Sequence, residues 1–214
     1  INDLIIEPFA GSACYSLYWS NTIMFKTNVI LYDINPIICE IWDYLINVKE
    51  SEILRLPELK HGEKIPVNIC QGAKYLIGFW VSKAATMPRL SMTNKSHCDV
   101  KGNLGFWSAQ IKQRIANQLQ FIRHWKIFND CYSNIPNRPA TWYIDPPYQE
   151  SGEHYKYSDI DYNHLGQWSR SRSGRSIVCE HNQADWLPFK TLSRNKGMLK
   201  NNVELIYTQD NNGH

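Results

Sequence analysis

The chain has 214 residues, of which 43% are hydrophobic and 20% are charged. This composition excludes an intrinsically disordered protein and suits one substantial core, with room for a small appended lobe. The formal net charge of +3 is too small to indicate a nucleic-acid binder by itself, and no apolar run approaches the length that a membrane-spanning helix needs.

The first part of the chain alternates short apolar runs with helical patterns. Residues 4–9, LIIEPF, predict a buried strand, which leads into the small residues of the turn at 10–13. Residues 29–32, VILY, predict a second strand, and the apolar spacing over 36–48 predicts a helix. Strand, tight turn, helix, strand and helix in this order are typical of a doubly wound α/β sheet of the Rossmann kind.

The pattern changes in the middle of the chain. Residues 50–106 predict two or three short helical pieces and then a polar, turn-rich run at 86–105, which is too long for an ordinary connection. Residues 107–126 predict a helix with four apolar side chains along one face, and with Lys112 largely off that face. We therefore expect a main domain formed by residues 1–49 and 107–214, and a mostly helical insertion at 50–106.

The sheet resumes after that helix. A strand is predicted at 141–144, a helix at 160–170, and further strands at 176–179 and 203–208. The six cysteines are scattered without a CxxC pair or a Cys/His cluster at metal spacing. We therefore predict no metal site, free thiols and a reducing, cytoplasmic location.

EPFAGSA, residues 7–13, is the first candidate binding motif. A turn of small residues after a strand lets a cofactor approach the backbone, and the following helix offers free N–H groups. The structural alternative is an ordinary tight turn between a strand and a helix. The motif is neither GxGxxG nor a glycine-lysine phosphate loop, so a pyrophosphate cradle and nucleotide hydrolysis are disfavoured.

Two acids follow later strands. Asp33 ends the second predicted strand, where a carboxylate can accept hydrogen bonds from ribose hydroxyls; the alternative is an acid at the start of the next helix. Asp130 ends a third short strand in our interpretation, and it could contact an adenine amino group. Its alternative is a solvated acid in a turn.

The most informative motif is DPPY, which ends the strand at 141–144. The prolines lack N–H groups and have a fixed φ, so the Asp145 carboxylate and the Pro146 carbonyl can be two fixed acceptors. Two acceptors match the two N–H groups of an exocyclic amine, and Tyr148 offers a ring on which a flat base can stack. The alternative is that Pro146 and Pro147 simply terminate the strand.

EPFAGSA, YDINP, FNDCY, TWYIDPPYQ and IVCEHNQADWLPF occur in this order along the chain. In order and spacing they resemble the motifs of the DNA adenine-N6 methyltransferases of the D12 class, most of all the phage and prophage type. The resemblance covers nearly the whole chain. It implies a Rossmann-like S-adenosylmethionine-dependent fold, and methyl transfer to adenine N6 on a base flipped out of double-stranded DNA. It also implies a bacterial or phage-encoded protein.

The resemblance assigns roles to matching residues. The methionine side of S-adenosylmethionine would lie against the turn after the first strand, and Asp33 would bind its ribose with Ile34 against the adenine; Asp130 is a further adenine contact. The residues of that turn are Pro8, Phe9, Ala10, Gly11 and Ser12. The catalytic motif would be Asp145, Pro146, Pro147 and Tyr148.

The family's pattern also has a lysine- and glycine-containing motif before the first strand. The printed sequence begins at Ile1, on that strand, and does not contain it. Two interpretations follow: the motif lies upstream of Ile1, or the chain is an inactive relative that binds DNA or a nucleoside without catalysis. A further alternative is a methyltransferase that acts on RNA or protein, because related acid-Pro-Pro-aromatic turns serve those substrates as well.

We expect contacts with DNA on the insertion, which is the candidate target-recognition region. Arg89, Lys95 and Lys101 in the polar run are candidates for phosphate or base contacts, against the alternative of a solvated loop. The basic run SRSRSGRS instead suits the C-terminal end of a helix, where cations interact favourably with the helix dipole.

Overall fold

The structure is a computed structural model that describes residues 3–22, 27–59, 62–81, 86–91, 107–150, 152–196 and 201–211. The chain divides into two compact units, one of Ile1–Pro36 with Trp125–His214 and one of Ile37–His124. We predicted an insertion at 50–106. The second unit is longer at both ends because it also contains the helices that flank this range.

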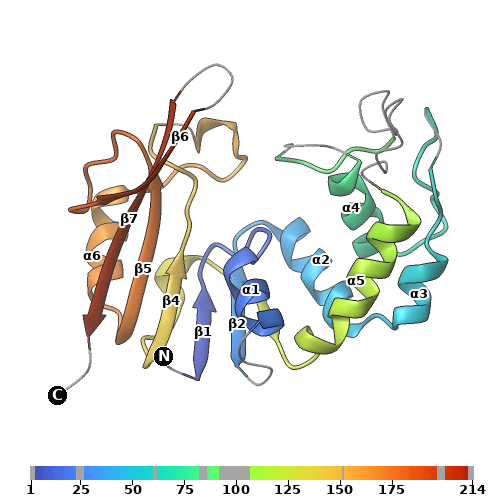
Figure 1. Cartoon of the computed structure of the whole chain (residues 1–214), viewed down its shortest axis with the longest axis horizontal. Helices are drawn as coiled ribbons and strands as arrows, with labels where there is room; N and C mark the ends of the chain where they lie inside the picture. Colours follow the sequence, from blue (N-terminus) through green and yellow to red (C-terminus); the bar gives the residue numbers. More distant parts are fainter. Residues whose placement is uncertain are drawn as a thin grey trace. The chain divides into compact units, whose positions relative to one another are not determined.

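A seven-stranded sheet forms the centre of the first unit (Figure 1). Its strands are β1 (Leu4–Glu7), β2 (Asn28–Asp33), β3 (Lys126–Asn129), β4 (Ala140–Ile144), β5 (Gly174–His181), β6 (Lys190–Lys196) and β7 (Asn201–Asn211). The order across the sheet is β3-β2-β1-β4-β5-β7-β6. The first five of these are parallel, and β7 runs antiparallel to both of its neighbours.

The order 3-2-1-4-5 of the parallel strands is that of a doubly wound Rossmann sheet. The prediction of an α/β fold with a mixed sheet is therefore confirmed, and the strand order is compatible with a Rossmann-like fold. The chain continues from β1 to β2 on one side of β1, whereas β4 pairs on its other side. The carboxyl ends of β1 and β4 consequently form the topological switch point, the place where such sheets bind ligands.

Helices α1 (Cys14–Thr22) and α6 (Tyr162–Arg170) pack on opposite faces of the sheet. Trp142 of β4 contacts Trp168 of α6 with ring centroids 5.5 Å apart. Tyr143, the next residue, stacks on Tyr15 of α1 with centroids 4.4 Å apart. Successive side chains of a strand point to opposite faces, so β4 is buried on both. Its continuous apolar run is the expected pattern for such a strand.

The two edge strands of the sheet, β3 and β6, differ in how well the sequence predicted them. Asp130 follows β3 directly, as predicted. β6 was not predicted, because its sequence KTLSRNK contains a single apolar residue, Leu192, which is 60% exposed. An edge strand that pairs with one neighbour needs no apolar alternation to be held, and β7 supplies that pairing.

Among the described residues of the second unit, the regular elements are helices, and Lys64 and Ser91 form an isolated β-bridge. Its helices are α2 (Pro36–Asn47), α3 (Glu50–Arg55), α4 (Gln71–Trp80) and α5 (Ala109–Ile122). The predicted apolar face of α5 is confirmed, since Ile115, Leu119 and Ile122 are buried. Lys112, which we predicted to lie largely off that face, is nevertheless buried and only 6% exposed.

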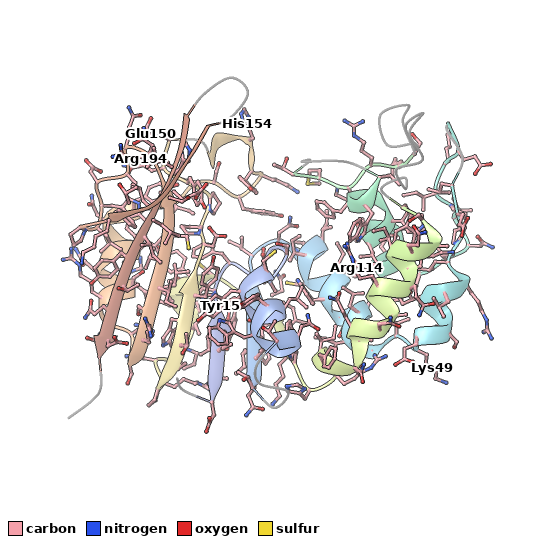
Figure 2. The ribbon with its side chains drawn as sticks, in the orientation of Figure 1. Tyr15, Lys49, Arg114, Glu150, His154 and Arg194 are labelled. Carbon is pink, nitrogen blue, oxygen red and sulfur yellow. The ribbon has the colours of Figure 1, made fainter. Side chains whose placement is uncertain are left out.

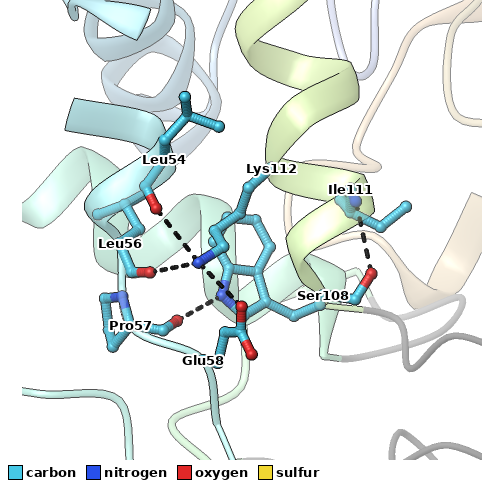
Figure 3. Close-up of polar contacts among 8 residues, drawn as sticks. Leu54, Leu56, Pro57, Glu58, Ser108, Ile111 and Lys112 are labelled. Atoms are coloured by element: carbon cyan, nitrogen blue, oxygen red, sulfur yellow. Dashed lines mark hydrogen bonds and ion pairs between the residues drawn. The ribbon is translucent and has the colours of Figure 1, made fainter. Parts of the chain in front are cut away.

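The Lys112 ammonium group lies at the C-terminal end of α3 (Figure 3). It donates to the carbonyl oxygens of Leu54 and Leu56 at 3.3 and 2.8 Å and lies 3.4 Å from a carboxylate oxygen of Glu58. The last carbonyls of a helix have no partner within it. The buried lysine supplies that partner and joins α5 to α3.

Three absences apply to the part of the chain that the structure describes. No helix there has the length and apolar character needed to cross a bilayer, and no group of three or more ligand side chains could hold a metal ion. The five cysteines among these residues are free.

Candidate functional site

The loop that follows β1 crosses to the end of β2. The Ala10 N–H donates to the Tyr32 carbonyl oxygen at 2.9 Å, and the Gly11 N–H donates to Asp33 Oδ2 at 3.0 Å. Gly11 has a φ of +43° and no atom within 4 Å of the position of a Cβ. This left-handed turn favours glycine and leaves open space in front of its backbone.

Asp33 occupies the predicted place at the carboxyl end of β2. Besides Gly11, its carboxylate accepts the Asn35 N–H on Oδ1 at 2.8 Å. Burial raises the pKa of Asp33, while the two backbone hydrogen bonds lower it. The hydrogen bonds from Gly11 and Asn35 fix this carboxylate at the carboxyl end of β2.

An exposed aliphatic side chain follows this carboxylate in the chain, and an aromatic pair involves the turn after β1. Ile34, which follows Asp33, is 46% exposed at the end of the strand. Phe9 is half-buried and contacts the ring of Tyr132, with centroids 5.5 Å apart. The arrangement combines an acceptor, an open glycine turn and an exposed aliphatic side chain, which is the donor–acceptor and apolar set that a nucleoside requires.

Asp130 is brought to the same edge of the sheet through its neighbour. The Asn129 side chain donates to the Asp33 carbonyl oxygen at 2.8 Å, and Asp33 and Asn129 are paired residues of β2 and β3. Asp130 Oδ1 accepts from Cys131 N at 2.7 Å and from Asn134 Nδ2 at 2.8 Å. Part of its acceptor capacity is therefore used to cap a local turn, and the adenine contact stays a prediction.

The DPPY turn leaves β4 at the switch point. Asp145 is exposed to solvent at the strand end, whereas Pro146 is buried beneath it. Desolvation by the surrounding protein raises the pKa of Asp145 to about 6; a hydrogen bond with Tyr148 lowers this pKa, and the charges of Glu204 and Glu180 raise it. The turn thus presents a solvent-accessible carboxyl group whose protonation changes close to neutral pH.

The backbone around Tyr148 is held from several sides. The Tyr162 hydroxyl donates to the Pro147 carbonyl oxygen at 2.8 Å, which attaches the turn to α6. The Gly152 N–H donates to the Tyr148 carbonyl oxygen, and a Cβ on Gly152 would lie only 2.9 Å from Pro147. The Tyr148 ring is parallel to that of His181, with centroids 6.1 Å apart and planes inclined by 6°.

A second carboxyl group lies behind the turn on the α1 face of the sheet. Glu7, the last residue of β1, is 2% exposed, and its Oε1 accepts the Ser16 N–H of α1 at 2.8 Å. Burial raises the pKa of Glu7 to about 7; the hydrogen bond from Ser16 lowers it, and the charge of Asp145 raises it. Tyr143 lies on the same face, stacked on Tyr15 (labelled in Figure 2), and accepts a hydrogen bond from the Cys179 thiol at 3.3 Å.

The predicted nucleic-acid contacts are described in part. Arg89 is exposed, and its backbone N–H donates to the Gly78 carbonyl oxygen at 3.1 Å, which attaches its segment to α4. Lys95 and Lys101 lie outside the described residues. In the basic run after α6, Arg172 is 8% exposed and lies over the rings of Trp168 and Trp142 at 4.3 and 5.3 Å. Its guanidinium also donates from Nε to the Trp168 carbonyl oxygen at 3.0 Å, so the structural interpretation is confirmed for Arg172.

Four residues around the turn were not assigned a role from the sequence. They are Glu7, Gly152, Tyr162 and Glu180. Glu7 stands inside the EPFAGSA motif, and Glu180 ends a predicted strand, so an acid at the carboxyl end of a central strand was the available signal. The contacts of Gly152 and Tyr162 depend on how a loop and a helix return to the turn, which no local pattern specifies.

No protein-family model matches this sequence, and a search of curated proteins finds no match. The site is therefore interpreted from its own residues and from the motifs described above.

Proposed function

We propose that the protein transfers a methyl group from S-adenosylmethionine to the exocyclic N6 of adenine in DNA, acting on a base that has left the helix stack. One observation carries the proposal: EPFAGSA and DPPY follow adjacent parallel strands, β1 and β4, whose carboxyl ends meet at the switch point. An acceptor for an amine and an open, nucleoside-compatible edge are thus found at the same end of one sheet.

The residues of the β1 and β2 ends fit this cofactor. The Asp33 carboxylate lies at the end of the second strand, where such folds bind ribose hydroxyls. Ile34 offers exposed aliphatic surface for the adenine, and the turn at Gly11 has room for close approach. S-adenosylmethionine would supply an activated methyl group. The protein's own contribution is to bind and orient the amine that receives it.

The DPPY turn supplies that orientation. The amine of adenine is a poor nucleophile because its lone pair is delocalised into the ring. If the Asp145 carboxylate and the Pro146 carbonyl accept its two N–H groups, the nitrogen can become pyramidal and its lone pair localised as charge develops. The Tyr148 ring gives the base a surface on which to stack. Holding the amine in line with the methyl group provides the rest of the rate enhancement.

The decisive experiment replaces Asp145 in a methyl-transfer assay with labelled S-adenosylmethionine and unmethylated duplex DNA. We expect Asp145→Asn to lower kcat by about 100-fold or more, because a developing charge loses an ionised partner, and to leave cofactor binding within a few-fold. Since the pKa of Asp145 is raised to about 6, the wild-type rate should increase with pH through this value.

Asp159→Asn is the matched control, because Asp159 is an exposed acid of the same strand-to-helix connection. Near-wild-type activity of Asp145→Asn would contradict the role of the turn. Incorporation of label into RNA or protein, with none into DNA, would contradict the substrate.

A further inference from the structure

Glu180 is the most completely hydrogen-bonded buried acid near the turn. It is the penultimate residue of β5 and is 1% exposed. Its Oε1 accepts from the Gln149 N–H at 2.8 Å and from Trp186 Nε1 at 3.1 Å, and its Oε2 accepts from the His181 N–H at 2.7 Å. All three partners can only donate, so the position requires a group with two accepting oxygens.

These bonds form part of a closed chain of contacts around Tyr148. On one side, Gln149 is bonded to Glu180. On the other side, Pro147 accepts from the hydroxyl of Tyr162, whose ring lies 5.7 Å from that of Trp186. Trp186 then donates back to Glu180. The residues before and after Tyr148 are therefore attached to the same group of side chains.

Glu180 also relates the turn to the strand beside it. Its Oε2 holds the backbone of His181, whose ring is parallel to that of Tyr148. Its Oε1 holds the residue that follows Tyr148. One carboxylate thus fixes both backbones that carry the ring pair, and charge-assisted bonds of this kind are about twice as strong as neutral ones.

We propose that Glu180 is the positioning residue of the DPPY turn: it touches no ligand, but it holds Tyr148 where the target base needs it. This inference rests on the proposed function in one respect, which is that the ligand held by the turn is an adenine base. The attachment of the turn to β5 does not depend on it.

Glu180→Gln tests the proposal with almost no change of volume. A side-chain amide has one accepting oxygen and one donating NH₂ group, so at least one of the three N–H partners would face another donor. We expect amide hydrogen exchange in residues 145–150 to become at least tenfold faster. We expect kcat for methyl transfer to fall at least tenfold, while the Kd for S-adenosylmethionine, measured by calorimetry, stays within twofold.

The matched control is Glu150→Gln, at an exposed acid next to Gln149 (Figure 2), which should leave exchange and kcat within twofold of wild type. Trp186→Phe is a milder test for the case in which Glu180→Gln does not fold. It keeps an aromatic ring and the carboxylate but removes one donor, so it should accelerate exchange and lower kcat by a smaller factor in the same direction.

Three results would overturn the proposal: unchanged exchange with unchanged kcat, faster exchange with unchanged kcat, or a lower kcat with unchanged exchange. A purely structural role would instead weaken cofactor binding and lower Tm together with activity. If the wild-type protein transfers no methyl group to DNA, the proposed function fails separately. Exchange in residues 145–150 then still decides whether Glu180 holds the turn.

Discussion

The two carboxyl groups Glu7 and Asp145 lie at the ends of adjacent strands and have raised pKa values for related reasons. Glu7 is enclosed between β1 and α1, whereas Asp145 is exposed at the rim of the site. Only the buried group should have a large effect on stability, because solvent screens the charge of an exposed one. Near neutral pH the folded protein can therefore hold one proton on Glu7 that the unfolded chain has released.

Glu7→Gln should remove the dependence of the folding stability on pH that this proton causes. The folded state keeps the proton up to a pKa of about 7, against an ordinary value of 4.5, so the stability of the wild-type protein falls as pH rises from 4.5 to 7. At about 1.4 kcal/mol per pKa unit, the ionised side chain costs up to about 3 kcal/mol above pH 7. The amide oxygen of Gln can still accept the Ser16 N–H.

We therefore expect Glu7→Gln to unfold at a higher temperature than wild type at pH 8, with the difference shrinking towards pH 5. Thermal unfolding across this pH range measures it. Glu40→Gln, at an exposed acid on α2, is the control and should follow the wild-type pH profile. A difference in Tm that does not vary with pH would show that the carboxyl group of Glu7 is not the origin.

Among the helices, the junction of α3 and α5 shows how one polar side chain can replace a conventional cap. α3 has six residues, too few to be stable alone. The Lys112 ammonium group and the Trp107 indole, which donates to the Pro57 carbonyl oxygen at 2.8 Å, bind the backbone at and just after the end of this helix. Its end therefore depends on side chains from the first turn of α5 and from the residue before the N-cap of α5.

Lys112→Met should destabilise the helical unit by about 1–3 kcal/mol, the cost of leaving buried carbonyl groups without a partner. Methionine keeps most of the apolar stem, so packing changes little. Glu58→Gln, the control, should cost less than about 1 kcal/mol, because Glu58 is 62% exposed and such ion pairs are weak. Urea denaturation followed by circular dichroism compares the two. Equal effects would mean that the ion pair, rather than the carbonyl bonds, holds the junction.

At the scale of the whole molecule, the net charge affects how strongly the protein could attract DNA, the proposed partner. A net charge of +3 gives little long-range attraction for DNA, so binding must depend on a few local cations. If Arg89 contacts a phosphate, Arg89→Ala should weaken DNA binding on all sequences and reduce the slope of log K against log salt by about one. Arg55→Ala, at an exposed arginine of α3, controls for the lost charge. An unchanged slope in Arg89→Ala would exclude that contact.

The sequence predicted the elements whose pattern is local. The buried strands β1, β2, β4 and β5 and the helix α2 follow from apolar runs and periodicity, and Asp33 and Asp145 were placed because strand ends are visible in such patterns. β6 and the buried Lys112 were missed because their places depend on partners distant in the chain. The hydrogen bond from the Tyr162 hydroxyl to the Pro147 carbonyl oxygen could not be predicted for the same reason.

The pairing of β2 with β3 has a consequence for how the sheet can form. Asp33 and Asn129 are 96 positions apart, about four times the separation of the β1–β2 pair Glu7 and Leu31. Closing the longer loop costs about 1.2 kcal/mol more entropy, at about 0.6 kcal/mol for each doubling of length. If the helical unit folds first, most of that chain is already ordered and the remaining loop is short. The rate at which β2 and β3 pair, at the edge that carries Asp33, would then be set by the folding of the helical unit, although that unit contains neither strand.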